Sequence, residues 1–162
     1  MSKTKLLVID VETDGLLDEM TTIHCAVAKD YISGEVTQFR PGEISDFADM
    51  IDGNVVIGHN IISFDLPAIQ RFHDVSPKML IDTLVMSRLL NPDRERPEGL
   101  PQKVGPHSLK AWGYRLGMLK GEYGEQDNAW VDFNEDMLAY CAQDVHVTAE
   151  VYKALLKEMQ DD

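Results

Sequence analysis

The sequence predicts an α/β fold, in which a mixed five-stranded sheet carries helices on both faces. Short apolar runs rich in β-branched residues, each bounded by turn residues, predict the strands. Segments whose apolar residues recur every three or four positions predict amphipathic helices. From the order of these elements we expect one layered domain spanning residues 1–162.

The first three strands are predicted to form an antiparallel meander. Residues 5–11 are an apolar run typical of a buried strand, which breaks at Asp14-Gly15, a strong turn signal. Residues 21–28 and 35–39 have the composition of two further strands, joined by a turn at Ser33-Gly34. The carboxyl end of the first strand, just before the turn at Asp14-Gly15, is where α/β sheets usually place ligand sites.

Helices and strands alternate in the middle of the chain. Residues 44–51 predict a short helix, and residues 55–58 predict the fourth strand. Residues 79–82 predict a brief fifth strand, which is followed by a helix through Leu90. Two stretches rich in charged residues and glycine are predicted to be exposed loops: residues 91–106 and 121–128.

Three further helices have recognisable starts. Pro67 suits the first turn of a helix in the segment 64–73. Ser108 has the character of an N-cap before another helix. Residues 133–159 predict a long helix, with Asn134 as its cap and an apolar stripe along one side.

Five residues from three short segments form a candidate catalytic site. Side chains on a strand alternate between its faces, so Asp10 and Glu12 point the same way. Asp65 follows the fourth strand. Tyr140 and Asp144 lie four residues apart, about one helical turn, and therefore share a helix face.

Each of these segments alone has a simpler structural explanation. An acidic pair after a strand is usually a turn with solvated charges, and an aspartate before a helix is usually a cap. A tyrosine and an aspartate at helical spacing are usually one core contact and one exposed charge. The occurrence of all three segments in one chain favours a shared site over three separate packing features.

Four carboxylates and one phenol suit metal-assisted cleavage of a phosphodiester. Magnesium and manganese are hard ions that bind oxygen ligands. Two such ions roughly 3.5–4 Å apart can activate a water and stabilise the leaving oxygen. Without metal, the same cluster repels itself, which raises some carboxyl pKa values. We expect Tyr140 to orient the attacking water by hydrogen bonding. It is not expected to act as a general base, because an unperturbed phenol is too weakly acidic at about pH 7.

The chain resembles the DEDD (DnaQ-like) exonuclease superfamily along nearly its whole length. The three motifs are VIDVETDGLL, GHNIISFDLPAI and YCAQDVHVT, and the segments IDTLVMSRLL, SLKAWGYRLG and MLKGEY are also similar. One branch of the superfamily has a histidine five residues before the last aspartate, where this chain has Ala139. Tyr140 lies four residues before Asp144, so the resemblance is to the tyrosine (DEDDy) branch, as in the proofreading domains of family A polymerases of short-tailed bacteriophages.

The resemblance implies an RNase H-like fold and a 3′→5′ exonuclease that releases nucleoside monophosphates one at a time from single-stranded DNA. It implies two divalent cations, Mg²⁺ or Mn²⁺, as cofactors. Tyr140 takes the position that orients the nucleophile. The positions of the metal ligands fall on four carboxylates: Asp10, Glu12, Asp65 and Asp144.

The resemblance also suggests contacts to the substrate. Thr13 and Leu16 match positions that support the terminal nucleotide, and Asn60 matches a position near the penultimate phosphate. The structural alternatives are a turn hydrophobe for Leu16 and a loop amide for Asn60. His59 and Asp82 are expected to be structural, with a supporting role behind the metal ligands as the alternative for Asp82.

Composition limits the remaining possibilities. A chain of 162 residues with 44% hydrophobic residues can bury a substantial core. Its apolar runs are too short to span a membrane, and Cys25 and Cys141 are too far apart for a zinc motif, so we expect a cytoplasmic protein, in the host cytoplasm if phage-encoded. The net charge of −13 disfavours broad duplex binding and favours weak, salt-sensitive binding of a strand end.

Two alternatives stay open beside the DNA exonuclease. The tyrosine branch includes enzymes that trim RNA, and the sequence contains no clear sensor of a 2′-hydroxyl. A module that only binds a polymerase is the non-enzymatic alternative, and it predicts eroded metal ligands, whereas all four carboxylates are present. A separately encoded DNA polymerase is the partner that the resemblance suggests.

Overall fold

The computed structural model describes residues 3–118 and 129–161, and its centre is a five-stranded sheet. The strand order is β3-β2-β1-β4-β5. β1 pairs antiparallel with β2 and parallel with β4, so the sheet is mixed, as the sequence predicts. The strands are β1 (Leu6–Thr13), β2 (Ile23–Asp30), β3 (Val36–Phe39), β4 (Val55–Gly58) and β5 (Met79–Asp82).

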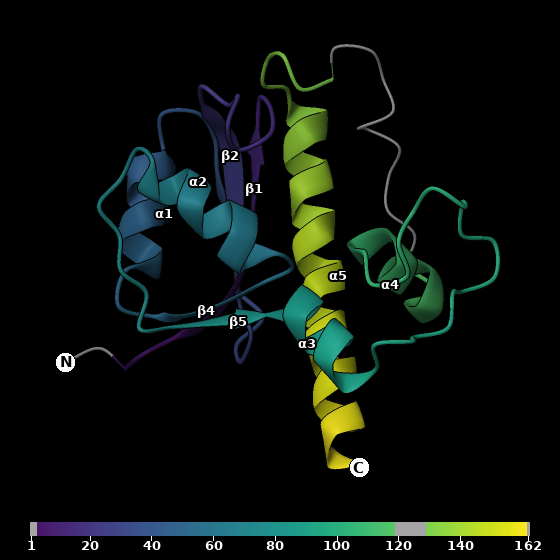
Figure 1. Cartoon of the computed structure of the whole chain (residues 1–162). Helices are drawn as coiled ribbons and strands as arrows, with labels where there is room; N and C mark the ends of the chain where they lie inside the picture. The colour runs from purple at the N-terminus through teal and green to yellow at the C-terminus, as the bar shows by residue number, and fades with distance from the viewer. Residues whose placement is uncertain (1–2, 119–128, 162) are drawn as a thin grey trace.

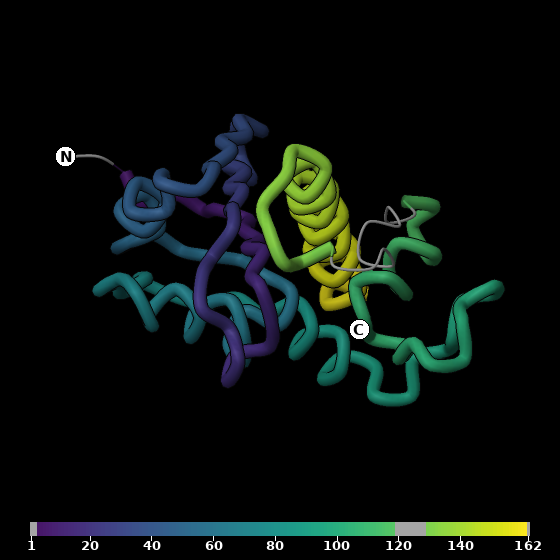
Figure 2. Tube along the Cα trace, turned by 90° about the horizontal axis from the view of Figure 1, so that it is seen from above, coloured from purple at the N-terminus to yellow at the C-terminus, as the bar shows by residue number. Residues whose placement is uncertain are grey.

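Helices cover both faces of the sheet, as Figures 1 and 2 show. α1 and α2 pack on one face, and the long helix α5 packs on the other, with α3 and α4 against its far side. This arrangement confirms the predicted α/β, RNase H-like layout. The helices are α1 (Ile44–Ile51), the π-helical turn η1 (Ile61–Asp65), α2 (Leu66–Gln70), α3 (Thr83–Leu90), α4 (Leu109–Leu116) and α5 (Glu135–Gln160).

Two predicted side-chain caps begin the helices α5 and α4. The Oδ1 atom of Asn134 accepts a hydrogen bond from Met137 N at 2.9 Å, so Asn134 caps α5 as predicted. Ser108 Oγ accepts from Ala111 N at 3.0 Å and caps α4, also as predicted. Such caps satisfy backbone donors that have no partner inside the helix.

The structure corrects three predicted boundaries. β1 and β2 each end two residues later than their local patterns suggest, because the two strands pair with each other over that stretch. The helix predicted within residues 64–73 is short, and a π-helical turn precedes it. Residues 91–106 contain neither helix nor strand, as predicted, whereas the predicted loop at residues 121–128 lies outside the described residues.

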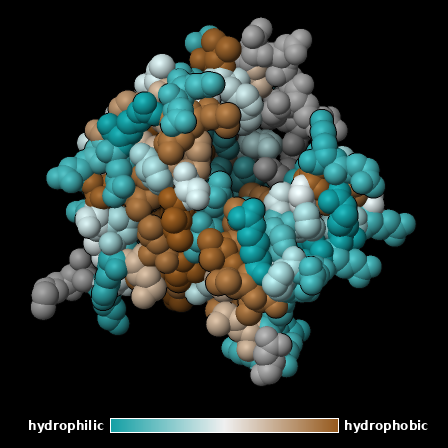
Figure 3. Space-filling view, in the orientation of Figure 1, coloured by the Kyte–Doolittle hydropathy of each residue, from teal (hydrophilic) through white to brown (hydrophobic). Residues whose placement is uncertain are grey.

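The surface has one notable concentration of apolar side chains. In Figure 3 they gather below α2 and around α3, while the side of α4 is mostly hydrophilic. Exposed members include Met79 on β5 and Val85 and Leu89 on α3. Among the described residues, no helix is both long and apolar enough to cross a membrane.

Candidate active site

The carboxyl end of β1 presents two acidic side chains to α5. Ile9 packs with the helices on the other face of the sheet, whereas Val8 packs under α5. Because strand side chains alternate, Asp10 and Glu12 lie on the same face as Val8. The pairing with β2 becomes irregular between Glu12 and Thr13, so the regular strand ends directly beyond the two carboxylates.

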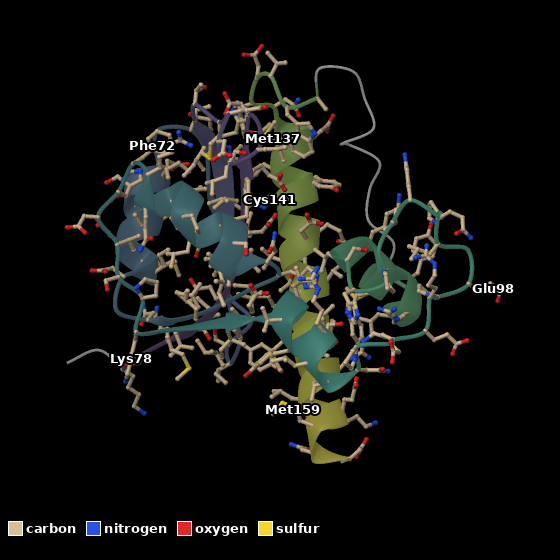
Figure 4. All side chains as sticks on the ribbon, viewed as in Figure 1. Phe72, Lys78, Glu98, Met137, Cys141 and Met159 are labelled. Atoms are coloured by element: carbon tan, nitrogen blue, oxygen red, sulfur yellow. The ribbon has the colours of Figure 1, made fainter. Side chains whose placement is uncertain are left out.

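One turn of α5 carries three further side chains, Tyr140, Cys141 and Asp144, of which Cys141 and Asp144 approach these carboxylates. Asp144 is 5% exposed, and Tyr140 is half-buried. Cys141 points from α5 toward β1 and β2 (Figure 4), and its Sγ donates a hydrogen bond to the backbone oxygen of Asp10 at 3.3 Å. Ligand-type atoms of Asp10, Glu12 and Cys141 all lie within 4.8 Å of one another.

Cys141 is a member of the cluster that the sequence analysis did not single out. Burial raises the pKa of its thiol well above the ordinary value, and a hydrogen bond with Cys25 raises it further. The sulfur therefore stays protonated, and soft sulfur is a poor ligand for Mg²⁺. Its position three residues before Asp144 on one helix is the local signal that could have revealed it.

Asp65 enters the cluster from the end of η1. Gly58 permits the sharp approach from β4, because a Cβ on this residue would lie only 2.8 Å from the Cβ of Ile61. Asn60 then adopts a left-handed conformation with φ of 71°, which asparagine tolerates better than most residues. The turn leaves Asp65 only 4% exposed. Single π-helical turns of this kind are frequent at functional sites.

Asp82 supports this turn from below. Its carboxylate accepts hydrogen bonds from Asn60 N at 2.9 Å and Ile62 N at 3.1 Å. It also caps α3 by accepting from Leu84 N at 2.9 Å and Val85 N at 3.3 Å. The structural role predicted for Asp82 is therefore confirmed, and the residue fixes the backbone that leads to Asp65.

The electrostatics of the cluster show mutual repulsion. Burial raises the pKa of Glu12 well above its ordinary value, and the charges of Asp10 and Asp144 raise it further. Burial likewise raises the pKa of Asp65, with added contributions from Asp10, Asp82 and Asp144. A positive charge in the cluster would relieve this repulsion, because it favours the ionised form of every carboxylate.

The donor set fits a divalent cation. Asp65 Oδ2 is buried and has no hydrogen-bond partner among residues 3–118 and 129–161. A buried acceptor without a partner is costly, so an orphan carboxylate oxygen inside an acidic cluster is a natural position for a metal ion. The four carboxylates provide the hard oxygen atoms that Mg²⁺ and Mn²⁺ prefer.

The ring of Tyr140 is held by an aromatic neighbour. It packs edge-on against Trp130, with ring centroids 6.0 Å apart and planes inclined by 70°. The backbone oxygen of Trp130 accepts a hydrogen bond from His24 Nε2 at 2.8 Å, which ties this segment to β2. The tyrosine ring therefore has a defined place on the same helix as Asp144.

A cavity of about 400 Å³ opens beside Glu12. It is lined by Thr13 and Leu16, two of the predicted substrate contacts, and Leu16 is 73% exposed. Phe64 and Trp130 add aromatic walls that the sequence analysis did not single out. Phe64 directly precedes the aspartate of the second motif, which is its only local signal, whereas Trp130 has none.

Asn60, the third predicted contact, lies elsewhere. It lines a second cavity of about 320 Å³ together with His59 and does not line the cavity beside Glu12. His59 is bonded through Nδ1 to Thr83 Oγ1 at 2.7 Å and through Nε2 to the backbone oxygen of His107 at 2.9 Å. The predicted structural role of His59 is thereby confirmed.

Comparison with known proteins agrees with this geometry. A family model described as 3′-5′ exonuclease matches residues 2–160. The DNA-directed DNA polymerase of Enterobacteria phage T3 is 37% identical over 193 aligned residues, and that of Escherichia phage T7 is 35% identical over the same length. Both alignments cover 97% of this chain and 27% of the polymerase, so the chain spans about a quarter of these relatives.

Solved structures share the fold at lower sequence identity. NrnC of Brucella melitensis with bound Mg²⁺ has a TM-score of 0.72 and 17% identity, covering 99% of this chain and 76% of that one. The exoribonuclease RNase D of Escherichia coli has a TM-score of 0.67 and 15% identity, covering 98% of this chain and 40% of the other. On the strength of the family match and the phage relatives, the chain belongs to the 3′-5′ exonuclease family, in the branch carried by phage DNA polymerases.

Proposed function

We propose that this chain removes nucleoside monophosphates from the 3′ ends of single-stranded DNA by a two-metal-ion mechanism. The observation that carries the proposal is the buried oxygen Asp65 Oδ2, which has no hydrogen-bond partner among the described residues and lies in a cluster of mutually repelling carboxylates. The family membership supplies the direction of cleavage. A bound pair of divalent cations would supply Lewis-acid stabilisation of the charge that develops at the scissile phosphate.

The metal-binding role falls to the four carboxylates. Asp10 and Glu12 reach the site from β1, Asp65 from η1 and Asp144 from α5, so three separate elements converge on it. Because these elements belong to the packed core, the ligands are held in place before substrate arrives, which lowers the cost of organising the site.

Tyr140 is assigned to orient the attacking water. Its hydroxyl can accept a hydrogen bond from the water and donate one to a phosphate oxygen. The ring is held against Trp130. The tyrosine acts by hydrogen bonding, since deprotonation of an ordinary phenol requires a pH of about 10.

The cavity beside Glu12 is assigned to the 3′-terminal nucleoside. Phe64 and Trp130 offer aromatic surfaces on which a base can stack, and stacking tolerates any base. Leu16 is exposed at the rim and can wedge beside the base, whereas Thr13 is buried and fixes the loop through a hydrogen bond from its hydroxyl to Gly15 O at 2.6 Å.

DNA is proposed as the substrate because the relatives above 30% identity are DNA polymerases. The solved structures of NrnC and of the exoribonuclease RNase D are below 20% identical and show the fold alone. The same relatives support a proofreading role with a separately encoded polymerase, exercised in the host cytoplasm if the chain is phage-encoded.

The test is product analysis with a 5′-labelled single-stranded DNA oligonucleotide and its RNA counterpart, with Mg²⁺ or Mn²⁺. We expect a metal-dependent ladder that shortens from the 3′ end, faster on DNA, and absent with EDTA or in Asp10→Ala. A preference for RNA would change the substrate class. Absence of cleavage of either strand by well-folded protein would overturn the nuclease proposal.

A further inference from the structure

The second cavity, of about 320 Å³, lies next to β4, whereas the cavity beside Glu12 lies toward β2, and these two strands flank β1 on opposite sides. The cavity beside Glu12 is built from the end of β1 and the connection toward β2, whereas the second is built beyond the end of β4. Of the residues that the structure describes, the two cavities share none in their linings. The lining of the second cavity comes from the end of β4, from α3 and from the loop before α4: His59, Asn60, Leu84, Arg88, Gly105, Pro106, His107, Ser108 and Leu109.

A chain of hydrogen bonds makes this cavity rigid. Trp112 Nε1 donates to Ser87 Oγ at 3.1 Å, and Ser87 Oγ lies 2.8 Å from His107 Nδ1. The other ring nitrogen of His107 lies 3.2 Å from Pro92 O, and the backbone oxygen of His107 receives the bond from His59. The network joins the residue after β4, the helix α3 and the loop before α4.

The same network orients the two histidine rings. A backbone oxygen can only accept, so His59 Nε2 and His107 Nε2 each donate a hydrogen bond. Their Nδ1 atoms lie within hydrogen-bond distance of the hydroxyl oxygens of Thr83 and Ser87. Among the described residues that line the cavity, Arg88 is the only arginine or lysine.

Arg88 differs from the other described arginines in its contacts. Arg94 forms an ion pair with Glu158 at 3.0 Å, and Arg40 forms one with Glu135 at 2.9 Å. Arg71, Arg96 and Arg115 each donate to a backbone oxygen. In the described part of the chain, Arg88 alone has no hydrogen bond or ion pair with protein, although it is exposed at a cavity.

We propose that Arg88 and the cavity it lines bind the backbone phosphate on the 5′ side of the scissile linkage. The inference rests on the proposed function, because it requires a strand whose 3′ end occupies the carboxylate site. The amide of Asn60 provides a second polar contact at the edge nearest the site, and Asp82 holds its backbone. A guanidinium matches the geometry of a phosphate with two parallel hydrogen bonds.

This assignment explains how a chain of net charge −13 can hold a polyanion. In this arrangement the DNA strand is held at three places. The carboxylate cluster holds it through the bound cations, the aromatic cavity beside Glu12 holds its terminal base, and Arg88 holds one backbone phosphate. Such a footprint requires few positive charges on the protein.

The experiment compares oligonucleotides in which one linkage carries a neutral methylphosphonate, placed at successive positions from the 3′ end. In the wild-type protein, neutralising the linkage just 5′ of the scissile one should raise KM about tenfold and leave kcat unchanged. Arg88→Gln should show the same raised KM on unmodified DNA and no further response to the modification at that linkage. Arg88→Lys should fall between the two, because it keeps the charge and loses the two-pronged contact.

Arg40→Gln is the matched control, since it removes the same charge from an exposed residue that lines neither cavity. Its KM should stay at the wild-type value. The inference is overturned if Arg88→Gln retains the full response to the methylphosphonate, or if Arg40→Gln raises KM equally. If the wild-type protein degrades no oligonucleotide at all, the proposed function fails and this inference fails with it.

Discussion

The two faces of β1 bury very different side chains. Toward α1 and α2, Ile9 and Val11 belong to an apolar cluster and are almost completely buried. Toward α5, Val8 is apolar, but the next two residues on that face are Asp10 and Glu12. The comparison teaches that one strand can anchor the fold with one face and hold repelling charges with the other. The apolar face offsets what the charged face costs in the metal-free protein.

Asp10→Ala should produce the largest effect on chemistry and almost none on folding. Loss of a carboxylate from the metal-binding cluster should lower the cleavage rate by about 10³-fold or more. The metal-free protein should be equally or slightly more stable, because repulsion with Glu12 and Asp65 is relieved. Cleavage assays and urea unfolding measure the two quantities.

Asp49→Ala, an exposed aspartate on α1, is the control for that variant and should change neither quantity. A large loss of folded protein in Asp10→Ala would contradict the assignment of its face to chemistry.

Ile9→Ala should show the opposite behaviour, although the two residues are neighbours in the sequence. Ile9 is 1% exposed, so truncation should lower the free energy of unfolding by about 2–5 kcal/mol through lost burial and a residual cavity. The cleavage rate of the folded fraction should stay near the wild-type rate. Urea unfolding measures the free energy of unfolding. Initial cleavage rates, taken at urea concentrations below the unfolding transition, measure the activity of the folded fraction. If the cleavage rate of Ile9→Ala falls as far as that of Asp10→Ala, the two faces of β1 do not have separate roles in folding and chemistry.

Tyr140→Phe should lower turnover by about 10²-fold, because it removes the hydroxyl that we propose orients the attacking water. The affinity for Mn²⁺ should not change, since the four carboxylates remain. Single-turnover rates and metal titrations separate these two effects. Tyr31→Phe makes the same chemical change at a ring that packs against Tyr152, outside the site, and should leave turnover intact. An unchanged rate in Tyr140→Phe would remove the tyrosine from the mechanism.

Metal and pH should act together on the charged face. The pKa values of Glu12 and Asp65 are raised in the folded protein, so between the ordinary and the raised pKa it binds more protons than the unfolded chain. Without metal, these groups therefore make stability fall as the pH rises from about 4 through the raised values. Mg²⁺ at about 100 times its Kd should restore about 2.7 kcal/mol, with more effect at high pH.

Thermal melts with EDTA or Mg²⁺ across this pH range measure the coupling. Glu12→Gln lacks one of the titrating groups, so its metal-free stability should depend less on pH than that of the wild type. Metal stabilisation that is equal at all pH values would mean that the carboxylates do not hold the ion.

Cys141→Ala should have the smallest effect on stability and cleavage. It tests whether this residue on the α5 face serves core packing or metal binding. Removing the sulfur should lower stability by about 1 kcal/mol and leave cleavage near the wild-type rate, because a protonated thiol is a poor ligand for Mg²⁺. Cys25→Ala, at the neighbouring buried cysteine, should cost a similar amount. A tenfold loss of Mg²⁺ affinity in Cys141→Ala alone would instead make this sulfur part of the metal site.

Local patterns predicted much of the fold and part of the site. The bounds of α1, β4 and β5 agree with the predicted ranges, because each is a short periodic segment closed by turn residues. The shared face of Asp10 and Glu12 follows from strand alternation alone. The π-helical turn η1 has no such signal, since it depends on Gly58 approaching Ile61 and on Asp82 bonding to the backbone.

The sequence by itself therefore determined the order of the elements, the exonuclease family and which acidic side chains share a face within one element. Only the tertiary structure decided which faces meet. It brought Cys141 against Asp10, placed Trp130 beside Tyr140, and left Arg88 at a cavity without a hydrogen-bond or ion-pair partner among the described residues. The physical reason is that backbone periodicity acts over a few residues, whereas contacts between β1, α3 and α5 depend on strand pairing and core packing across the whole chain.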